Sequence, residues 1–206
     1  MNPALIIIDM QKDFQVPGGL CYDADSQARW KPVIRKVKNL LDVFRSKKLP
    51  VIHIVTIHRQ DYSDVEIGEL SDAQTMPGMT FNRPYLRPCG FMGTKGAEVI
   101  DDLKPVENET IIVKKRYSGF FSTDLDMVLR RNGVDTLFIT GGDADCCVRF
   151  TSADAYFRDY NVIVVTDCVE SDTKVEYHAA IHNIRKLLGT TRTLAETTEW
   201  LDKTFP

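Results

Sequence analysis

Short runs of apolar, largely β-branched residues recur along the chain and alternate with longer stretches of helical pattern. The runs are Ala4–Ile8, Val51–Ile57, Thr110–Val113, Thr136–Thr140 and Asn161–Thr166, with Thr190–Thr193 as a candidate sixth. A strand that is apolar at nearly every position is typical of a parallel sheet whose two faces are both covered by helices. The alternation therefore predicts one doubly wound α/β domain over residues 1–206.

The segments between these runs carry helical patterns and helix-start signals. Residues 27–48 have apolar side chains at helical spacing, and shorter helices are expected at 96–103, 148–160 and 173–188. Three Thr-x-x-Asp/Glu patterns predict capping boxes: Thr123 with Asp126, Thr173 with Glu176, and Thr193 with Glu196. Residues 58–95 are irregular, and a segment of this length is usually functional, so we expect it to supply a substrate wall.

Charge and hydropathy exclude several classes of protein. The chain of 206 residues has a net charge of −3, so it offers no basic field for nucleic acid. No apolar run approaches the roughly 20 residues that span a bilayer, and no targeting segment is visible, so we expect no membrane partner and a cytoplasmic location. Neither a GxGxxG motif nor a P-loop follows a predicted strand, and we expect no cofactor.

The cysteines and histidines argue against a disulfide framework and against a metal site. Five cysteines occur, at positions 21, 89, 146, 147 and 168, and none belongs to a CxxC motif. Their odd number and spacing fit a reducing compartment in which at least one thiol is able to react. The histidine pairs 53/58 and 178/182 lack a third ligand at a suitable spacing, so we expect no bound metal.

Three reactive side chains stand where predicted strands end. Asp9 follows the first run, Lys114 follows the third, and Cys147 lies at the start of the helix after the fourth. The carboxyl ends of parallel strands share one edge of the sheet, which is where open α/β sheets bind their ligands. We therefore expect these three side chains to lie close together.

Cys147 is the candidate nucleophile of this group. A helix N-terminus favours an anion, so the pKa of a thiol there is expected to be lowered. A cysteine nucleophile also needs a base and hydrogen-bond donors for an oxyanion. Asp9 fits the base and Lys114 fits a cation that tunes both neighbouring pKa values. The N–H groups of the turn at 143–147 fit the donors.

The residues alone leave other interpretations open. Cys146 and Cys147 also fit buried structural cysteines, because free cysteine is often buried. A redox sensor built on this vicinal pair is disfavoured, because adjacent cysteines are poorly placed for an unstrained disulfide. For Asp13, a carboxylate that caps a nearby turn is the favoured interpretation.

Three blocks of sequence resemble the isochorismatase-like cysteine hydrolases, over nearly the whole chain from Ile6 to about Thr193. Asp9-Met-Gln-Lys-Asp-Phe14 is similar to D-x-Q-x-D-F, and Lys114-Lys-Arg-Tyr-Ser-Gly-Phe120 to a lysine followed by x-R-Y-S-[AG]-F. Gly141 to Ala155 is similar to G-x-x-x-x-x-C-V-x-x-T-x-x-D-A. The blocks occur in the family's order, and the alignment selects Lys114 over Lys115 and Cys147 over Cys146.

The resemblance implies a three-layer fold with a six-stranded parallel sheet. It also implies an Asp9, Lys114 and Cys147 triad that hydrolyses a C–N bond through a thioester. A non-proline cis peptide is implied in the nucleophile turn, at Gly142–Asp143 by position, with Cys146 beside it and N–H groups facing the oxyanion. Residues 142–144 differ from the family's commoner V-A-T.

The resemblance also bears on the substrate. Members that hydrolyse isochorismate lack the cysteine, so Cys147 implies an amidase. The family's nicotinamidases carry a D-x-H…H metal site after the second strand, which residues 58–64 do not match, so the chain looks more like the branch acting on carbamoyl, ureido or biuret-type amides. The alternatives are a nicotinamidase-type amidase and a non-catalytic member that binds a metabolite. A homodimer or homotetramer is implied, with Phe14, His58, Arg116 and Tyr117 expected at the pocket.

Overall fold

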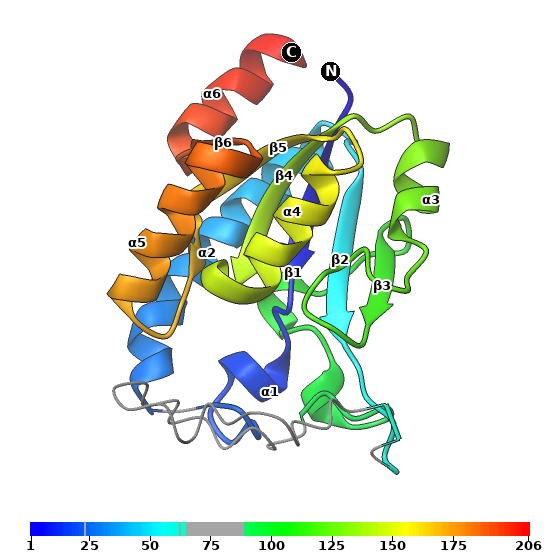
Figure 1. Cartoon of the computed structure of the whole chain (residues 1–206), viewed down its shortest axis with the longest axis vertical. Helices are drawn as coiled ribbons and strands as arrows, with labels where there is room; N and C mark the ends of the chain where they lie inside the picture. Colours follow the sequence, from blue (N-terminus) through cyan, green and yellow to red (C-terminus); the bar gives the residue numbers. More distant parts are fainter. Residues whose placement is uncertain (23, 62, 65–88) are drawn as a thin grey trace.

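The structure is a computed structural model that describes residues 1–22, 24–61, 63–64 and 89–206. Six strands form one sheet in the order β3-β2-β1-β4-β5-β6, and every neighbouring pair is parallel (Figure 1). They are β1 (Pro3–Ile8), β2 (Val51–Thr56), β3 (Thr110–Lys114), β4 (Thr136–Gly142), β5 (Asn161–Glu170) and β6 (Thr190–Arg192). The predicted α/β fold with a six-stranded parallel sheet is confirmed.

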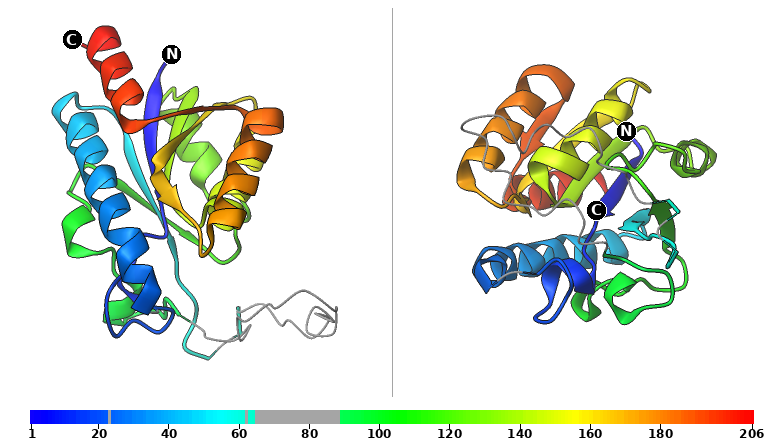
Figure 2. Two further views of the ribbon diagram at one scale, coloured as in Figure 1. Left: turned by 90° about the vertical axis from the view of Figure 1, so that its left-hand side faces the viewer. Right: turned by 60° about the horizontal axis from the view of Figure 1, so that its bottom comes forward.

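Helices cover both faces of this sheet (Figure 2). One face carries α2 (Ala24–Ser46) and α6 (Leu194–Thr204), and the other carries α3 (Leu125–Arg131), α4 (Arg149–Tyr156) and α5 (Lys174–Asn183). The buried strand β1 supplies both cores, because successive side chains of a strand point to opposite faces. Ile6 and Ile8 pack on the side of α3 to α5, whereas Leu5 and Ile7 pack on the side of α2.

The strand order reverses at β1, so the carboxyl end of β1 is the expected place for a ligand crevice. The chain leaves β1 toward β2 and β3 on one side, and β4, β5 and β6 continue on the other. Such a reversal of strand order opens a ligand crevice outside the carboxyl ends of the strands. The short helix α1 (Lys12–Gln15) follows β1 at this end, at the bottom of Figure 1.

Two of the three predicted capping boxes are present. Thr173 with Glu176 begins α5, and Thr193 with Glu196 begins α6. The box predicted at Thr123 and Asp126 is wrong, because α3 starts after Asp124 and has no side-chain cap. Asp126 accepts a hydrogen bond from the Tyr160 hydroxyl at 2.8 Å instead, so a tertiary contact occupies the carboxylate.

The helix predicted at 96–103 is also wrong. Two separate 3₁₀ turns, Lys95–Ala97 and Asp101–Leu103, occur there, and the residues between them are extended. The N–H of Ile100 donates to the carbonyl of Met10 at 3.0 Å, so this segment pairs with the chain after β1 rather than with itself. The helix predicted at 148–160 is shorter than expected, since α4 ends at Tyr156 and a π-helical turn, Ala144–Val148, precedes it.

Candidate active site

The ends of β1 and β3 bring Asp9 and Lys114 together as predicted. Lys114 is the last residue of β3 and pairs in register with Thr56 of β2, while Asp9 directly follows β1. The Lys114 ammonium lies 2.8 Å from Asp9 Oδ2, and only 2% of the lysine side chain is exposed. Asp9 has a φ of 54°, a left-handed value that is uncommon outside glycine and is often found at functional sites.

Cys147 completes this group from the far side of β1. It lies in the π-helical turn that follows β4, and its Sγ accepts a hydrogen bond from Lys114 Nζ at 3.4 Å. Cys147 is partly exposed, whereas Asp9 and Lys114 are buried. Cys147 is therefore the most exposed residue of the three.

The charges of this group differ in one respect from the sequence prediction. Burial alone would lower the pKa of Lys114, but the charges of Asp9 and Cys147 outweigh it and raise the pKa above its ordinary value. A hydrogen bond with the Cys146 thiol, burial and the charge of Asp9 raise the pKa of Cys147, against the opposing charge of Lys114. The expected lowering by the helix N-terminus is thus outweighed, and Cys147 rests as a thiol that needs a base.

Thr56 is a member of the site that the sequence prediction missed. Its hydroxyl accepts a hydrogen bond from Lys114 Nζ at 2.6 Å and donates to Asp9 Oδ1 at 2.9 Å. The Gln11 side chain in turn holds the Thr56 backbone, accepting from its N–H at 2.7 Å and donating to its carbonyl at 2.8 Å. The sequence held a signal for this role, because Thr56 ends β2 at the same edge of the sheet as Asp9 and Lys114.

The turn before Cys147 has the expected backbone. The peptide bond between Gly142 and Asp143 is cis, as the resemblance implied. Gly142 lies against the ring of Trp30, where an added Cβ would meet the indole at 2.3 Å. Within the turn, the N–H of Cys146 donates to the carbonyl of Asp143 at 3.1 Å. The N–H of Asp145 donates to Oγ of Ser171, the residue after β5, at 3.3 Å.

Hydrogen bonds join the second and third sequence blocks across the fold. Ser118 Oγ donates to Asp154 at 2.5 Å, and the N–H of Gly119 donates to Thr151 Oγ1 at 3.0 Å. Thr151 and Asp154 lie on α4, one and two turns after the nucleophile. The segment that follows Lys114 is therefore held against the helix that follows Cys147.

Two of the predicted pocket residues form a charged cluster with Asp64. His58 Nδ1 lies 3.5 Å from Asp64 Oδ1, and Arg116 donates to the Asp64 carbonyl at 3.0 Å. Lys115 lies 2.8 Å from the other carboxylate oxygen. Although burial acts to raise it, the pKa of Asp64 is lowered to about 2, chiefly by its hydrogen bond with Lys115, and burial lowers the pKa of His58. At neutral pH, a neutral imidazole therefore faces a carboxylate.

The two predicted aromatic residues are placed differently from each other. Phe14 lies in α1, at the crevice end of β1, and is partly exposed. Tyr117 is exposed and stacks on Phe150 of α4, with ring centroids 5.7 Å apart. The substrate wall expected from residues 58–95 lies mostly outside the described residues.

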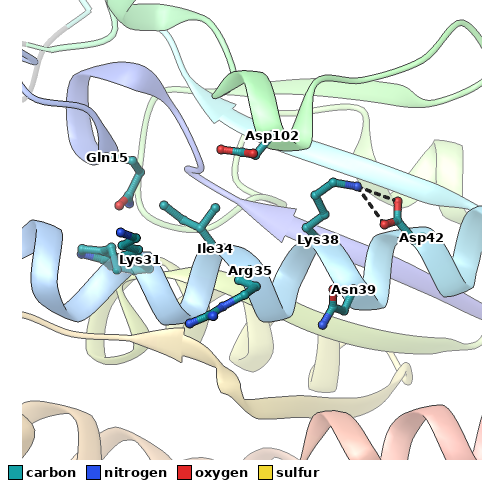
Figure 3. A pocket seen from close by; sticks show the side chains of 9 residues that line it. Gln15, Lys31, Ile34, Arg35, Lys38, Asn39, Asp42 and Asp102 are labelled. Carbon is teal, nitrogen blue, oxygen red and sulfur yellow. Dashed lines mark hydrogen bonds and ion pairs between the residues drawn. The ribbon is translucent and has the colours of Figure 1, made fainter.

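One hollow on the described residues is separate from this group. It is a groove of about 490 Å³ along the outer side of α2 (Figure 3). Its lining residues are Gln15, Trp30, Lys31, Ile34, Arg35, Lys38, Asn39, Asp42 and Asp102. No predicted site residue lines it, although Trp30 connects its wall to Gly142.

Two other kinds of feature are absent from the part of the chain that the structure describes. No group of three or more His, Cys, Asp or Glu side chains within the described ranges has the arrangement of a metal site. None of the helices described is both long and apolar enough to cross a membrane.

Comparison with known proteins gives consistent matches over almost the whole chain. Residues 3–196 match the isochorismatase domain. A probable inactive nicotinamidase of Arabidopsis thaliana is 33% identical over 97% of this chain and 96% of the relative. The ureidoacrylate amidohydrolase RutB of Pantoea ananatis is 31% identical over 90% of this chain and 76% of the relative.

A solved structure agrees with these matches. The N-carbamoylsarcosine amidase from Thermoplasma acidophilum has a TM-score of 0.75 and 29% identity to this chain. The match covers 94% of this chain and 97% of that one.

Proposed function

The chain belongs to the isochorismatase family, and we propose that within this family it is a cysteine-dependent amidohydrolase. The observation that carries the proposal is the contact of Lys114 with both Asp9 and Cys147 at the carboxyl edge of the sheet. A nucleophile, a base and a fixed cation are what cleavage of an amide through a covalent intermediate requires. The substrate is a small amide, carbamoyl or ureido compound.

Asp9 is the general base and acid of the proposed reaction. Because the pKa of Cys147 is raised, its proton must be removed as the sulfur attacks the amide carbonyl. Asp9 receives that proton and delivers it to the leaving ammonia or amine, which leaves a thioester on Cys147. Water then attacks the thioester with Asp9 again as base, and the acid product is released.

Lys114 and Thr56 position the base and the sulfur. The ammonium bridges Asp9 and Cys147, so its charge stabilises a thiolate as it forms. The Thr56 hydroxyl holds both members of the ion pair in place. The N–H groups of Asp145 and Cys146 donate within the protein, so we assign the oxyanion to the N–H groups of Ala144 and Cys147 in the same turn.

Relatives support the carbamoyl and ureido class of substrate. The names of the Pantoea and Thermoplasma proteins state that they act on ureidoacrylate and N-carbamoylsarcosine. Each substrate is a urea-type compound with a carboxylate. The cluster of His58 and Arg116 with Asp64 offers polar groups for such a substrate, and Phe14 offers an apolar surface at the end of β1.

Ammonia release from a panel of amides tests this proposal. The panel contains N-carbamoyl amino acids, ureidoacrylate, biuret, nicotinamide and a simple aliphatic amide. Cys147→Ser removes the nucleophile, and Cys168→Ser is the matched control because Cys168 is fully buried in the core beside α2. We expect release from a ureido compound by the wild type and by Cys168→Ser, with a loss of at least roughly a thousandfold in Cys147→Ser.

The same experiment separates two other candidate functions. The name of the Arabidopsis relative, a probable inactive nicotinamidase, favours either a nicotinamidase or a non-catalytic binder of a related metabolite. Ammonia release from nicotinamide and from no other amide would show that the chain is a nicotinamidase and not a hydrolase of ureido compounds. No release from any amide, together with a Cys147 that iodoacetamide alkylates no faster than an ordinary thiol, would support the second.

We also propose that the chain acts as a cytoplasmic homodimer or homotetramer. The outer strand β3 exposes Ile111 and Val113, and Phe121 and Met127 are exposed nearby in the chain, so apolar surface is present for a second copy. Light scattering coupled to size-exclusion chromatography tests the oligomer, and a monomeric mass at micromolar concentration would exclude it.

A further inference from the structure

Two cysteines that the proposed mechanism does not use are in contact beside the active site. Cys21 follows the loop after α1, and Cys89 lies near the start of the segment that leads toward β3. A side-chain hydrogen bond with Cys21 is the first cause that raises the pKa of Cys89, which places the two thiols close together. Both cysteines are reduced and partly buried.

One carboxylate holds the backbone on both sides of this contact. Asp13 Oδ1 accepts a hydrogen bond from the N–H of Leu20 at 3.2 Å, and Oδ2 accepts from the N–H of Gly90 at 2.8 Å. The N–H of Cys21 donates to the Asp13 carbonyl at 3.0 Å. Asp13 is 4% exposed. A buried clamp, rather than a chance approach of two surface loops, therefore sets the position of the two thiols.

The pair is connected to the catalytic group through Gly90. Gly90 is packed so closely on Thr56 that an added Cβ would lie 2.2 Å from the Thr56 carbonyl oxygen. The carbonyl of Gly90 accepts from the N–H of His58 at 2.8 Å. A displacement of Cys89 therefore acts on Thr56, whose hydroxyl joins Asp9 to Lys114.

We propose that Cys21 and Cys89 are a redox-active pair. Low-molecular-weight disulfides such as oxidised glutathione convert the two thiols to an intramolecular disulfide, and this disulfide slows the reaction of Cys147. This inference goes beyond the proposed function and does not depend on the substrate. It adds a covalent modification site to the edge of the active site.

The chemistry requires two exchange steps. The Cys21 thiolate attacks one sulfur of oxidised glutathione, breaks its S–S bond and releases one glutathione thiolate. The Cys89 thiolate then attacks the Cys21 sulfur of this mixed disulfide and releases the second glutathione. The two protein thiols lose two electrons and two protons, and oxidised glutathione gains them as two molecules of reduced glutathione.

The hydrogen bond between the thiols gives the order of these steps. This hydrogen bond is the largest cause that raises the pKa of Cys89, and burial and the charges of Cys21, Asp13 and Asp9 add to it. Cys89 therefore keeps its proton to a higher pH than an ordinary cysteine does. Because the thiolate is the nucleophile, Cys21 attacks first and Cys89 resolves the mixed disulfide.

The bond is expected to affect the active site because its surroundings are tight. A covalent bond draws the two sulfurs closer than a hydrogen bond between thiols does. Cys89 moves toward Cys21, and the adjacent Gly90 lies so close to Thr56 that we expect the movement to reach Thr56. We expect the ion pair of Asp9 with Lys114, and with it the reactivity of Cys147, to change.

Peptide mapping tests the covalent step. The full chain carrying Cys147→Ser, which removes the proposed nucleophile, is equilibrated with glutathione buffers of increasing oxidised fraction. It is then quenched with acid, alkylated and digested. We expect the peptides of Cys21 and Cys89 to be joined, with a mass two hydrogens lower, and to separate on treatment with dithiothreitol. Added Cys168→Ser leaves this result unchanged, and added Cys89→Ser abolishes it.

Two results would overturn the covalent proposal. One is that both cysteines remain open to alkylation in excess oxidised glutathione. The other is that each cysteine carries glutathione and no cross-link forms.

Alkylation of Cys147 tests the effect on the active site without any substrate. The wild type is oxidised by glutathione, the excess is removed, and the rate of Cys147 modification by iodoacetamide is compared with that of the reduced protein. We expect the rate to fall by roughly threefold or more and to recover with dithiothreitol, with no such change in Cys89→Ser. Equal rates for cross-linked and reduced protein would refute the proposed control of the site.

Discussion

Replacing Thr56 with valine removes one hydroxyl from the centre of the site and leaves the shape of the side chain almost unchanged. That hydroxyl accepts from the Lys114 ammonium at 2.6 Å and donates to the Asp9 carboxylate at 2.9 Å. Both partners are buried and charged, so neither can turn to water for a replacement.

The expected magnitude follows from these two contacts. A hydrogen bond to a charged group contributes about 1.5–3 kcal/mol to stability. Lys114 and Asp9 keep their direct ion pair in the variant, which offsets part of the loss. We therefore expect the free energy of unfolding to fall by about 2–4 kcal/mol. For a chain of this size the melting temperature should fall by roughly 5–15 °C.

Thr56→Ser is the matched control, because it keeps the hydroxyl and removes only the methyl group. That methyl group is partly buried and contributes about 1 kcal/mol at most. Urea denaturation followed by circular dichroism should rank the wild type above Thr56→Ser and Thr56→Ser above Thr56→Val.

Reactivity provides a second measurement on the same variants. With Lys114 held less firmly against the Cys147 sulfur, the thiolate is less stabilised, so the pH midpoint of alkylation should move upward in Thr56→Val. The bridging role of Thr56 would be refuted if Thr56→Val matched Thr56→Ser in both stability and alkylation profile.

Two further predictions concern folding stability. Gly141 has a φ of 100°, and an added Cβ would lie 2.1 Å from the Ile8 carbonyl oxygen, so Gly141→Ala should unfold the protein or lower its free energy of unfolding by roughly 4 kcal/mol or more. Gly133 also has a positive φ, of 65°, but has open space around it. The control Gly133→Ala should therefore lower the free energy of unfolding by only about 1 kcal/mol. Equal losses in urea denaturation would contradict the clash. The free energy of unfolding should also fall as the pH drops from 7, because burial lowers the pKa of His53 below 6.5 and only the unfolded chain then binds a proton at this residue. His53→Gln should flatten the dependence of the free energy of unfolding on pH between about pH 7 and 5. An unchanged pH dependence in this variant would assign it to other groups.

Much of the site could be predicted because its signals are local. An apolar β-branched run marks a buried parallel strand wherever it occurs, and the parallel arrangement puts all carboxyl ends at one edge. Asp9, Lys114 and Cys147 each stand at or just beyond such an end, so their juxtaposition follows from the order of the elements. The capping boxes at Thr173 and Thr193 are local in the same way, since they involve residues three positions apart.

Wrong predictions arose where contacts that the local pattern does not contain decided the outcome. Asp126 has the spacing for a capping box with Thr123, but the Tyr160 hydroxyl takes its carboxylate. The expected pKa of Cys147 considered only its helix, whereas a hydrogen bond with the Cys146 thiol, burial and the charge of Asp9 raise it. A tertiary contact decides the first case; in the second, a neighbouring thiol acts together with burial and with the carboxylate of a distant residue. Periodicity and spacing report none of these.

The sequence by itself determined the α/β fold and the three side chains at the edge of its sheet, because strand runs and strand ends are encoded within a few residues. Only the tertiary structure decided which groups surround them. The bridge of Thr56 between Asp9 and Lys114, and the contact of Cys21 with Cys89, join segments far apart in the chain. Such contacts depend on the packing of whole elements, since hydrogen bonds and charges act over a few ångströms of space whatever the separation along the chain.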